Sequence, residues 1–165
     1  MEANIKFAKV KEGAIVPSKR DEDVGLDIYA CFEEDWIEIA PHTSKLIPTG
    51  IASSFNKEWG IVFRERGSTG VKNLKVNAGV IDSGFRSEWF VGLYNGNDIP
   101  IYITKFMDGE RAPKAENAIL YPYTKGIAQA LVIPVPYITT NVIDYNELKA
   151  IKSERGMGML GSSNK

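Results

Sequence analysis

The sequence predicts an all-β fold that contains very little helix. Short runs rich in β-branched and aromatic residues recur along nearly the whole chain. Gly, Pro, Asn and Asp separate these runs at close spacing, and helical periodicity is scarce. This pattern is typical of a sandwich, jelly roll or barrel rather than of alternating strands and helices. A length of 165 residues suits one domain with a sizeable core.

The predicted strands follow one another with short connections. Each is a run of apolar, β-branched or aromatic residues bounded by turn residues. They cover residues 5–10, 26–32, 36–40, 45–55, 60–65, 88–94, 99–106 and 127–138.

Two stretches predict short helices. Residues 68–73 suit one turn, and residues 144–152 suit two turns with Asp144 as the N-cap. Neither helix is long enough to form a layer. Residues 108–118 are polar and contain Gly and Pro, which predicts a long surface loop.

The C-terminal segment 153–165 is rich in Gly and Ser and shows no periodicity, which argues against packing in the core. One interpretation is a frayed terminus. The other is a mobile flap that closes over phosphates, because Arg155 and exposed backbone N–H groups suit phosphate oxygens.

Charge and composition exclude several functions. The formal net charge is −1 and the pI is about 5.9, with Lys and Arg scattered, so we expect no nucleic-acid partner. The single Cys31 and single His42 allow neither an internal disulfide nor a four-ligand zinc site. No long apolar segment is present, so we expect no membrane contact and a soluble protein in the cytoplasm.

Two internal stretches suggest phosphate chemistry, although each has an ordinary structural explanation. In RERGSTG (64–70), Arg66 precedes a turn with Gly67 and Ser68, which brings a guanidinium, N–H groups and hydroxyls together. A structural turn explains the same residues. In DVGLDIYA (23–30), Asp27 alternates with apolar neighbours and points to the opposite face of a strand. That face is either solvent or a site.

Two further stretches place a polar side chain among apolar ones. Gln129 lies inside the apolar run 127–135, so its amide must find a partner in the core or on a ligand. In AGVIDSGFRSE (78–88), Asp82 directly follows Val80 and Ile81. Asp82 is therefore either a turn residue that bonds its own backbone or a carboxylate used in a reaction.

Taken together and in order, these stretches resemble the five motifs of the trimeric dUTP diphosphatases (dUTPases). The third motif is the sharpest match, and the resemblance runs from Asp23 almost to Lys165. The motifs are DVGLDIYA (23–30), RERGSTG (64–70), AGVIDSGFRSE (78–88), KGIAQALVIPV (125–135) and ERGMGMLGSS (154–163).

The resemblance implies a jelly-roll, β-clip-like barrel that assembles as a homotrimer. Residues 1–152 would form the nucleotide-hydrolase domain, and residues 153–165 would form an arm that closes an active site made by neighbouring subunits. The implied reaction is the Mg²⁺-dependent hydrolysis of dUTP to dUMP and pyrophosphate, which keeps uracil out of DNA.

The resemblance also implies roles for individual residues in the reaction. Asp82 would be the general base that deprotonates the water attacking the α-phosphorus. Asp27 would hold Mg²⁺ through water, and the ion would neutralise the leaving pyrophosphate. Arg66, Ser68, Gln129 and Arg155 would donate hydrogen bonds to the phosphates. Gly67, Gly161 and Ser162 would also contact the substrate.

Recognition of the nucleoside is implied for a second group of residues. Phe85 stands where the family has an aromatic residue beneath the deoxyribose, and its ring would leave no room for a 2′-hydroxyl. Leu160 replaces the usual Phe, so it would cover uracil without stacking on it. The edge of uracil would be read by the hairpin that contains Asn77, Gly79, Val80 and Ile81.

Three rival functions remain open. A dCTP deaminase of the same fold would need a glutamate where this chain has Gly92. A non-catalytic nucleotide-binding or signalling trimer would not need both Asp82 and Asp27. A general nucleotide pyrophosphatase would lack uracil selectivity, which depends mostly on the backbone.

Overall fold

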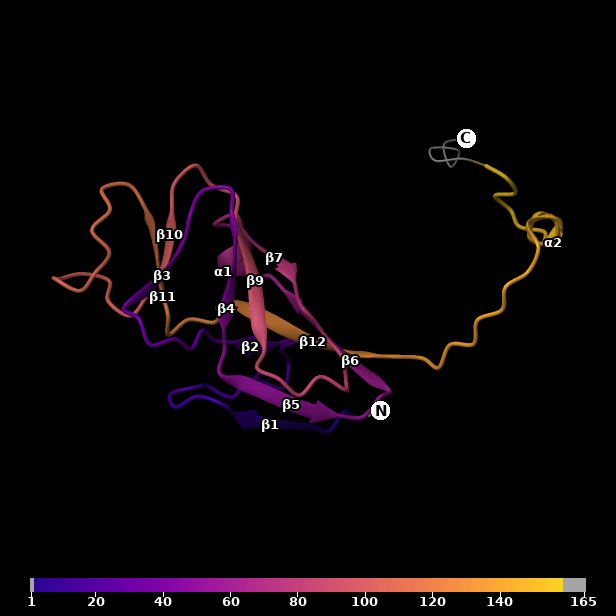
Figure 1. The fold of residues 1–165 in the computed structure, drawn as a ribbon, viewed down its shortest axis with the longest axis horizontal. Helices are drawn as coiled ribbons and strands as arrows, with labels where there is room; N and C mark the ends of the chain where they lie inside the picture. The colour runs from indigo at the N-terminus through magenta and orange to yellow at the C-terminus, as the bar shows by residue number, and fades with distance from the viewer. Residues whose placement is uncertain (1, 159–165) are drawn as a thin grey trace. The chain divides into compact units, whose positions relative to one another are not determined.

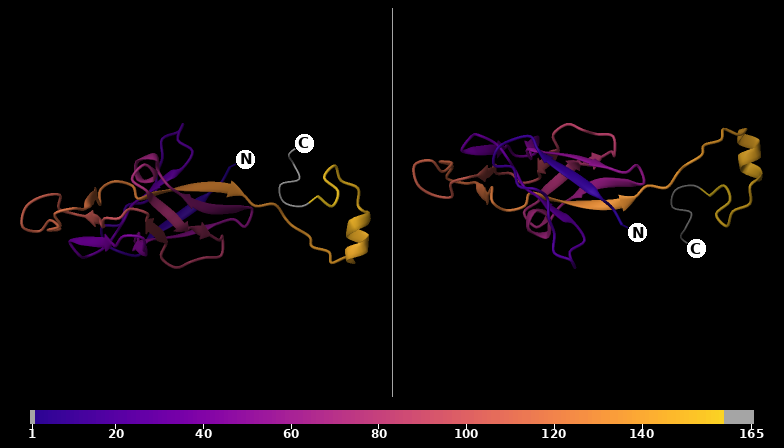
Figure 2. Two further views of the ribbon diagram at one scale, coloured as in Figure 1. Left: turned by 90° about the horizontal axis from the view of Figure 1, so that it is seen from above. Right: turned by 90° about the horizontal axis from the view of Figure 1, so that it is seen from below.

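The computed structural model describes residues 2–158 (Figures 1 and 2). Residues up to Val135 form one compact unit, and residues from Pro136 onward form a second. The boundary between the two units therefore lies before residue 153, where the predicted arm begins. The role of the arm stays a prediction.

The first unit consists of strands apart from one short helix, which confirms the predicted all-β class. The helix α1 (Gly67–Gly70) coincides with the start of the predicted turn at 68–73. The strands are β1 (Ile5–Lys9), β2 (Leu26–Ile28), β3 (Trp36–Ile39), β4 (Ser44–Pro48), β5 (Ile51–Phe55), β6 (Trp59–Arg64), β7 (Leu74–Ala78), β8 (Val80–Ile81), β9 (Phe90–Asn95), β10 (Ile101–Thr104), β11 (Ile119–Pro122) and β12 (Ala128–Pro134).

The strands form small sheets, as in a jelly roll. Their orders are β1-β5, β11-β10-β3, β2-β12-β6-β8 and β4-β9-β7. Every pairing is antiparallel except that of β10 with β11, which is parallel. In Figure 1 the sheet of β3, β10 and β11 lies at one end of the unit, and the loop between β10 and β11 extends from that end. The sheet β2-β12-β6-β8 contains the predicted site residues Asp27 and Gln129.

Three strands were not predicted, and one predicted run is divided. β7 and β8 are short and interrupted by Gly79, and β11 follows directly after the predicted loop 108–118. Their pairing partners stabilise them rather than any local apolar pattern. The run 45–55 divides into β4 and β5 because Gly50 has a φ of +66°, where a Cβ would lie 2.7 Å from that of Ala14.

Aromatic packing fills the centre of the first unit. Trp89 is fully buried, and its ring lies 5.5 Å from that of Phe7 and 5.4 Å from that of Phe63. Such edge-to-face and tilted contacts are the preferred geometry of aromatic pairs. Because Phe63 lies on β6, this cluster also supports the strand that leads into the predicted second motif.

A buried asparagine ties the loops at the end of β9 together. The Asn95 amide donates to the carbonyl oxygens of Ile39 at 3.0 Å and Ile99 at 2.8 Å, and its Oδ1 accepts from the Asn97 N–H at 3.0 Å. The next amide, Gly96 N–H, donates to Asn73 O at 3.0 Å. A fully buried amide is thereby satisfied, as burial requires.

The second unit contains the predicted C-terminal helix, α2 (Tyr145–Ala150). Asp144 is its N-cap and accepts from the Asn146 N–H at 2.7 Å, which confirms the sequence prediction. The Glu147 side chain accepts from the Asp144 N–H at 3.3 Å and completes a capping box. Local sequence therefore fixes where this helix begins.

Candidate active site

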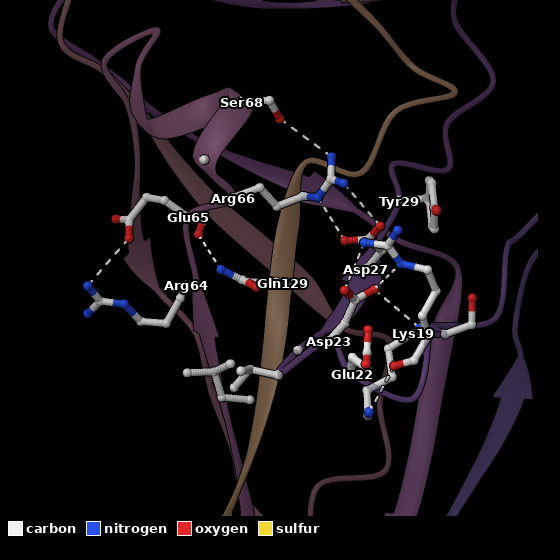
Figure 3. Close-up of a pocket in the computed structure, with 16 residues that line it drawn as sticks. Lys19, Glu22, Asp23, Asp27, Tyr29, Arg64, Glu65, Arg66, Ser68 and Gln129 are labelled. Carbon is white, nitrogen blue, oxygen red and sulfur yellow. Dashed lines mark hydrogen bonds and ion pairs between the residues drawn. The ribbon is translucent and has the colours of Figure 1, made fainter.

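An open cavity of about 1130 Å³ lies where three strands of one sheet meet (Figure 3). Residues 18–29 form one wall, the end of β6 and the start of α1 form the second, and β12 forms the third. The cavity brings together five of the predicted site residues, which come from the first, second and fourth motifs: Asp27, Arg66, Gly67, Ser68 and Gln129.

Asp27 and Arg66 form a bidentate ion pair in this cavity. Arg66 Nε donates to Asp27 Oδ1 at 2.7 Å, and Nη2 donates to Oδ2 at 3.1 Å. The two side chains are 33% and 29% exposed, so the pair is partly shielded from water. This parallel arrangement is the strongest form of arginine–carboxylate contact. The first two motifs are thus joined directly.

The remaining Arg66 nitrogen reaches the turn before β12. Nη1 donates to Gly126 O at 3.3 Å. A Cβ at Gly126 would lie 3.1 Å from Arg66 Cδ and 3.2 Å from Nε, so the guanidinium passes where a side chain would stand. No role was predicted for Gly126 from the sequence.

Gln129 is held in the centre of the sheet. Its residue pairs with Asp27 on β2 and with Arg64 on β6, and its Nε2 donates to Glu65 O at 2.7 Å. The amide therefore has a backbone partner, which satisfies one of its polar groups. Its side chain still lines the cavity (Figure 3).

Glu65 connects this cavity to β7 and was not identified from the sequence. Its Oε1 accepts from the Val76 N–H at 3.0 Å. That hydrogen bond, together with one from the Glu65 backbone, lowers the pKa of the Glu65 carboxyl below its ordinary value. An ionised carboxylate thus holds β7 beside the end of β6.

A second ion pair lies at the rim of the cavity. Arg20 Nε donates to Asp23 Oδ2 and Nη2 to Oδ1, both at 2.9 Å. Arg20 lowers the pKa of Asp23 by these side-chain hydrogen bonds. Figure 3 shows Lys19, Glu22 and Asp23 along the same wall. Charges of both signs therefore border the opening.

The predicted third motif lies on the other side of β6 from β12. β8 pairs with β6 through Ile81 opposite Ile61, and Asp82 follows β8 at the surface. The Asp82 carbonyl oxygen accepts from the Phe85 N–H at 3.0 Å, which closes a turn. In the described part of the chain, no residue from 77 to 85 lines the cavity. One chain alone does not bring Asp82 to the ion pair.

The predicted nucleoside-reading residues surround this turn. Asn77 lies at a bulge of β7 and donates to Ser44 Oγ at 2.8 Å. Gly79 O accepts from the Phe63 N–H at 2.6 Å, and a Cβ at Gly79 would lie 2.5 Å from that of Phe63. Val80 is 71% exposed and Phe85 is 39% exposed. The hairpin thus presents apolar surface that no residue of the described chain covers.

The predicted fifth motif falls in the second unit, and the structure describes only its first residues. Arg155 Nε donates to Gly158 O at 3.3 Å, within a local turn. Leu160, Gly161 and Ser162 lie outside the described residues.

The side chains around Asp27 suit a metal ion that takes most of its direct ligands from a bound nucleotide rather than from the protein. Among residues 2–158 there is no group of three or more His, Cys, Asp or Glu side chains that could form a metal cage. Each Asp27 oxygen accepts one N–H from Arg66, which leaves lone pairs for water. These residues fit a hydrated Mg²⁺ that takes its direct ligands from phosphates.

The position that a deaminase would need offers no acid. Gly92 on β9 lies opposite Ala78, and a Cβ there would stand 3.3 Å from the Ala78 Cβ and nitrogen. A glutamate at this position would have to displace β7. Within residues 2–158, no helix is long and apolar enough to cross a membrane.

Comparison with known proteins identifies the family. The dUTPase family model matches residues 11–108. The deoxyuridine 5′-triphosphate nucleotidohydrolase of Photorhabdus laumondii is 31% identical over 143 residues, covering 84% of this chain and 79% of that protein. That of a Picosynechococcus species is 27% identical over 164 residues, covering 97% and 98%.

Solved structures show the same fold. The dUTPase of Staphylococcus bacteriophage 80alpha, solved with dUPNHPP, has a TM-score of 0.74 at 17% identity and covers 98% of this chain and 99% of its own. The sequence match, the fold and the order of the motifs agree, and the chain belongs to the dUTPase family.

Proposed function

We propose that this protein hydrolyses dUTP to dUMP and pyrophosphate. Family membership carries the proposal, because the two relatives compared above are deoxyuridine 5′-triphosphate nucleotidohydrolases. The cavity supports it, since Arg66, Ser68 and Gln129 gather around one space with room for a polyphosphate. Gly92 argues against the deaminase alternative.

Different residues of the chain would bind the substrate and accept the proton. Arg66 and Ser68 would hold the phosphate chain in line for attack. Asp82 would orient a water and accept its proton as it attacks the α-phosphorus. Phe85 would pack against the deoxyribose and exclude ribose. The main chain around Gly79 would read uracil.

Mg²⁺ is part of the proposal. It would neutralise the phosphate oxygens of the nucleotide, and Asp27 would hold it through water. Because Arg66 also pairs with Asp27, the carboxylate would serve two cations at once. That shared carboxylate would keep the guanidinium and the metal close to the same phosphate chain.

We further propose that the protein is a homotrimer whose active sites are shared between subunits. The separation of Asp82 from the cavity within one chain supports this, because catalysis requires both. The described surface also exposes Leu46, Val80 and Phe90 at 63%, 71% and 42%. Exposed apolar side chains such as these suit burial against other subunits. The arm 153–165 would then close a neighbour's site.

The proposed trimer can be tested by complementation. Arg66→Ala and Asp82→Asn subunits, each inactive alone, are unfolded together and refolded as a mixture. A shared site predicts recovered activity, because some mixed trimers pair an intact Arg66 with an intact Asp82. Refolding each variant alone is the control. No recovery, with mixed trimers demonstrated by a mass tag, would contradict shared sites.

The reaction itself is tested by incubating the protein with Mg²⁺ and dUTP, dCTP, dTTP or UTP in parallel. Pyrophosphate release and chromatography of the nucleotides report the products. We expect dUMP from dUTP and almost no change in the other three. Deoxyuridine nucleotides formed from dCTP would indicate a deaminase. Equal hydrolysis of all four nucleotides would indicate a general pyrophosphatase, and binding without turnover would indicate a non-catalytic trimer.

We also propose that the protein is cytoplasmic, because the reducing cytoplasm suits the free thiol of Cys31.

A further inference from the structure

A buried tyrosine outside the five motifs contacts the cavity residues. Tyr121 lies on β11, after the long loop, and is 2% exposed. Its hydroxyl donates to Gly126 O at 2.7 Å. The same carbonyl oxygen accepts from Arg66 Nη1 at 3.3 Å. One main-chain oxygen therefore connects the tyrosine to the guanidinium.

The direction of these hydrogen bonds can be assigned. A carbonyl oxygen only accepts, so the single proton of the Tyr121 hydroxyl is committed to Gly126 O. Ser68 Oγ lies 3.5 Å from the Tyr121 hydroxyl oxygen, and it must be the donor in that long contact. Arg66 Nη1 donates to Ser68 Oγ, also at 3.5 Å. The Ser68 hydroxyl is thus oriented from both sides.

The tyrosine itself cannot move easily. β11 pairs in parallel with β10, which places Tyr121 opposite Ile103, and both side chains are buried. The Gly126 backbone is also closely packed, since Arg66 fills the space beside its Cα. A rigid hydroxyl therefore fixes the carbonyl and the serine that Arg66 contacts.

We propose that Tyr121 is a positioning residue for Arg66 and Ser68. It sets both donors in place before the nucleotide arrives, so that less order is lost on binding. Tyr121 does not itself touch the nucleotide. The inference rests on the proposed function, in which this pair binds the phosphate chain.

Tyr121→Phe tests the proposal, because it removes only the hydroxyl. We expect kcat/KM for dUTP and affinity for dUPNHPP each to fall about fivefold, the usual effect of one neutral hydrogen bond. Affinity for dUMP should stay unchanged, because dUMP lacks the outer phosphates. The control is Tyr123→Phe, because the Tyr123 ring packs against Phe32, with 6.0 Å between the ring centres. It should leave all three values unchanged.

A second measurement separates positioning from general stability. In a Ser68→Ala background, Tyr121→Phe should have a smaller effect on dUPNHPP affinity than in the wild type, because one of the two side chains that Tyr121 positions is absent. An equal loss of dUMP and dUPNHPP affinity, or a full effect in the Ser68→Ala background, would overturn the proposal. Unchanged kinetics in an active protein would overturn it too. A wild type that neither binds dUPNHPP nor hydrolyses dUTP would overturn the proposed function as well.

Discussion

Asp27 and Arg66 bind each other through two parallel hydrogen bonds, one to each carboxylate oxygen. Removing either side chain leaves a partly buried charge without its partner. We therefore expect Asp27→Ala and Arg66→Ala each to destabilise the fold, and the double variant to lose less than their sum. A coupling of about 1 kcal/mol is expected for such a pair. Urea unfolding of the three variants measures it, and strict additivity would contradict the coupling.

Asp82→Asn should abolish most turnover while leaving the fold and nucleotide binding intact. The amide keeps the shape of the side chain but cannot accept the proton, and the residue is exposed. We expect kcat to fall about 10²- to 10⁴-fold, measured by pyrophosphate release. Asp108→Asn, on the exposed surface loop, is the matched control. A near-normal kcat would remove Asp82 from the role of base.

Gly126→Ala should displace Arg66, because the new Cβ would lie 3.1 Å from Arg66 Cδ. We expect kcat/KM for dUTP to fall by about tenfold or more, as for loss of a charge-assisted donor. Gly70→Ala is the comparison, since a Cβ there would meet its nearest neighbour at an ordinary 3.8 Å. An equal kcat/KM for the two variants would show that the Arg66 guanidinium moves without loss of activity.

Glu65 should contribute to the acid sensitivity of the fold. Its pKa is lowered from the ordinary 4.5, chiefly by the hydrogen bond from the Val76 N–H. A lowered pKa stabilises the fold above the unfolded value, and that stability is lost as pH falls through the folded value. Glu65→Gln cannot titrate, so its urea midpoint should decline less steeply than that of the wild type below pH 4.5.

The control for this pH dependence is Glu110→Gln on the exposed loop, which should follow the wild type. Identical acid limbs for the wild type and Glu65→Gln would exclude a contribution from this carboxylate.

Truncation after Glu154 should spare the fold of the first unit, because residues up to Val135 form a compact unit by themselves. We expect an unchanged Tm and a loss of activity of about 10²-fold, as for removal of one donor to the transition state. The full-length chain with Arg155→Ala shows how much of the loss belongs to that side chain. An unaffected rate in the truncated protein would identify the segment as a frayed terminus.

The sequence predicted most strands because apolar alternation and turn residues are local properties. It predicted α2 for the same reason, since Asp144 and Glu147 cap that helix without help from elsewhere. β8 and β11 escaped prediction because their order depends on β6 and β10, which are distant in sequence.

For the site, side-chain chemistry indicated Asp27, Arg66 and Gln129 as candidates, and the fold brings them together. Tyr121 and Gly126 could not be chosen in the same way. Their contributions are a hydroxyl and a carbonyl whose partners are defined only by the packing of β11 and β12. The role of Asp82 stays a prediction, because one chain does not complete a site around it.

The hydrogen bonds around Asn95 also have a consequence for the chemical lifetime of the protein. Asn-Gly is the dipeptide most prone to deamidation, which begins when the glycine nitrogen attacks the asparagine side-chain carbonyl carbon. Here that nitrogen is bound to Asn73 O, and the amide is fixed to two carbonyl oxygens. The folded chain thus resists ageing at this bond. A chain that deamidates while unfolded would carry a carboxylate facing the oxygens of Ile39 and Ile99, and it would not regain this packing.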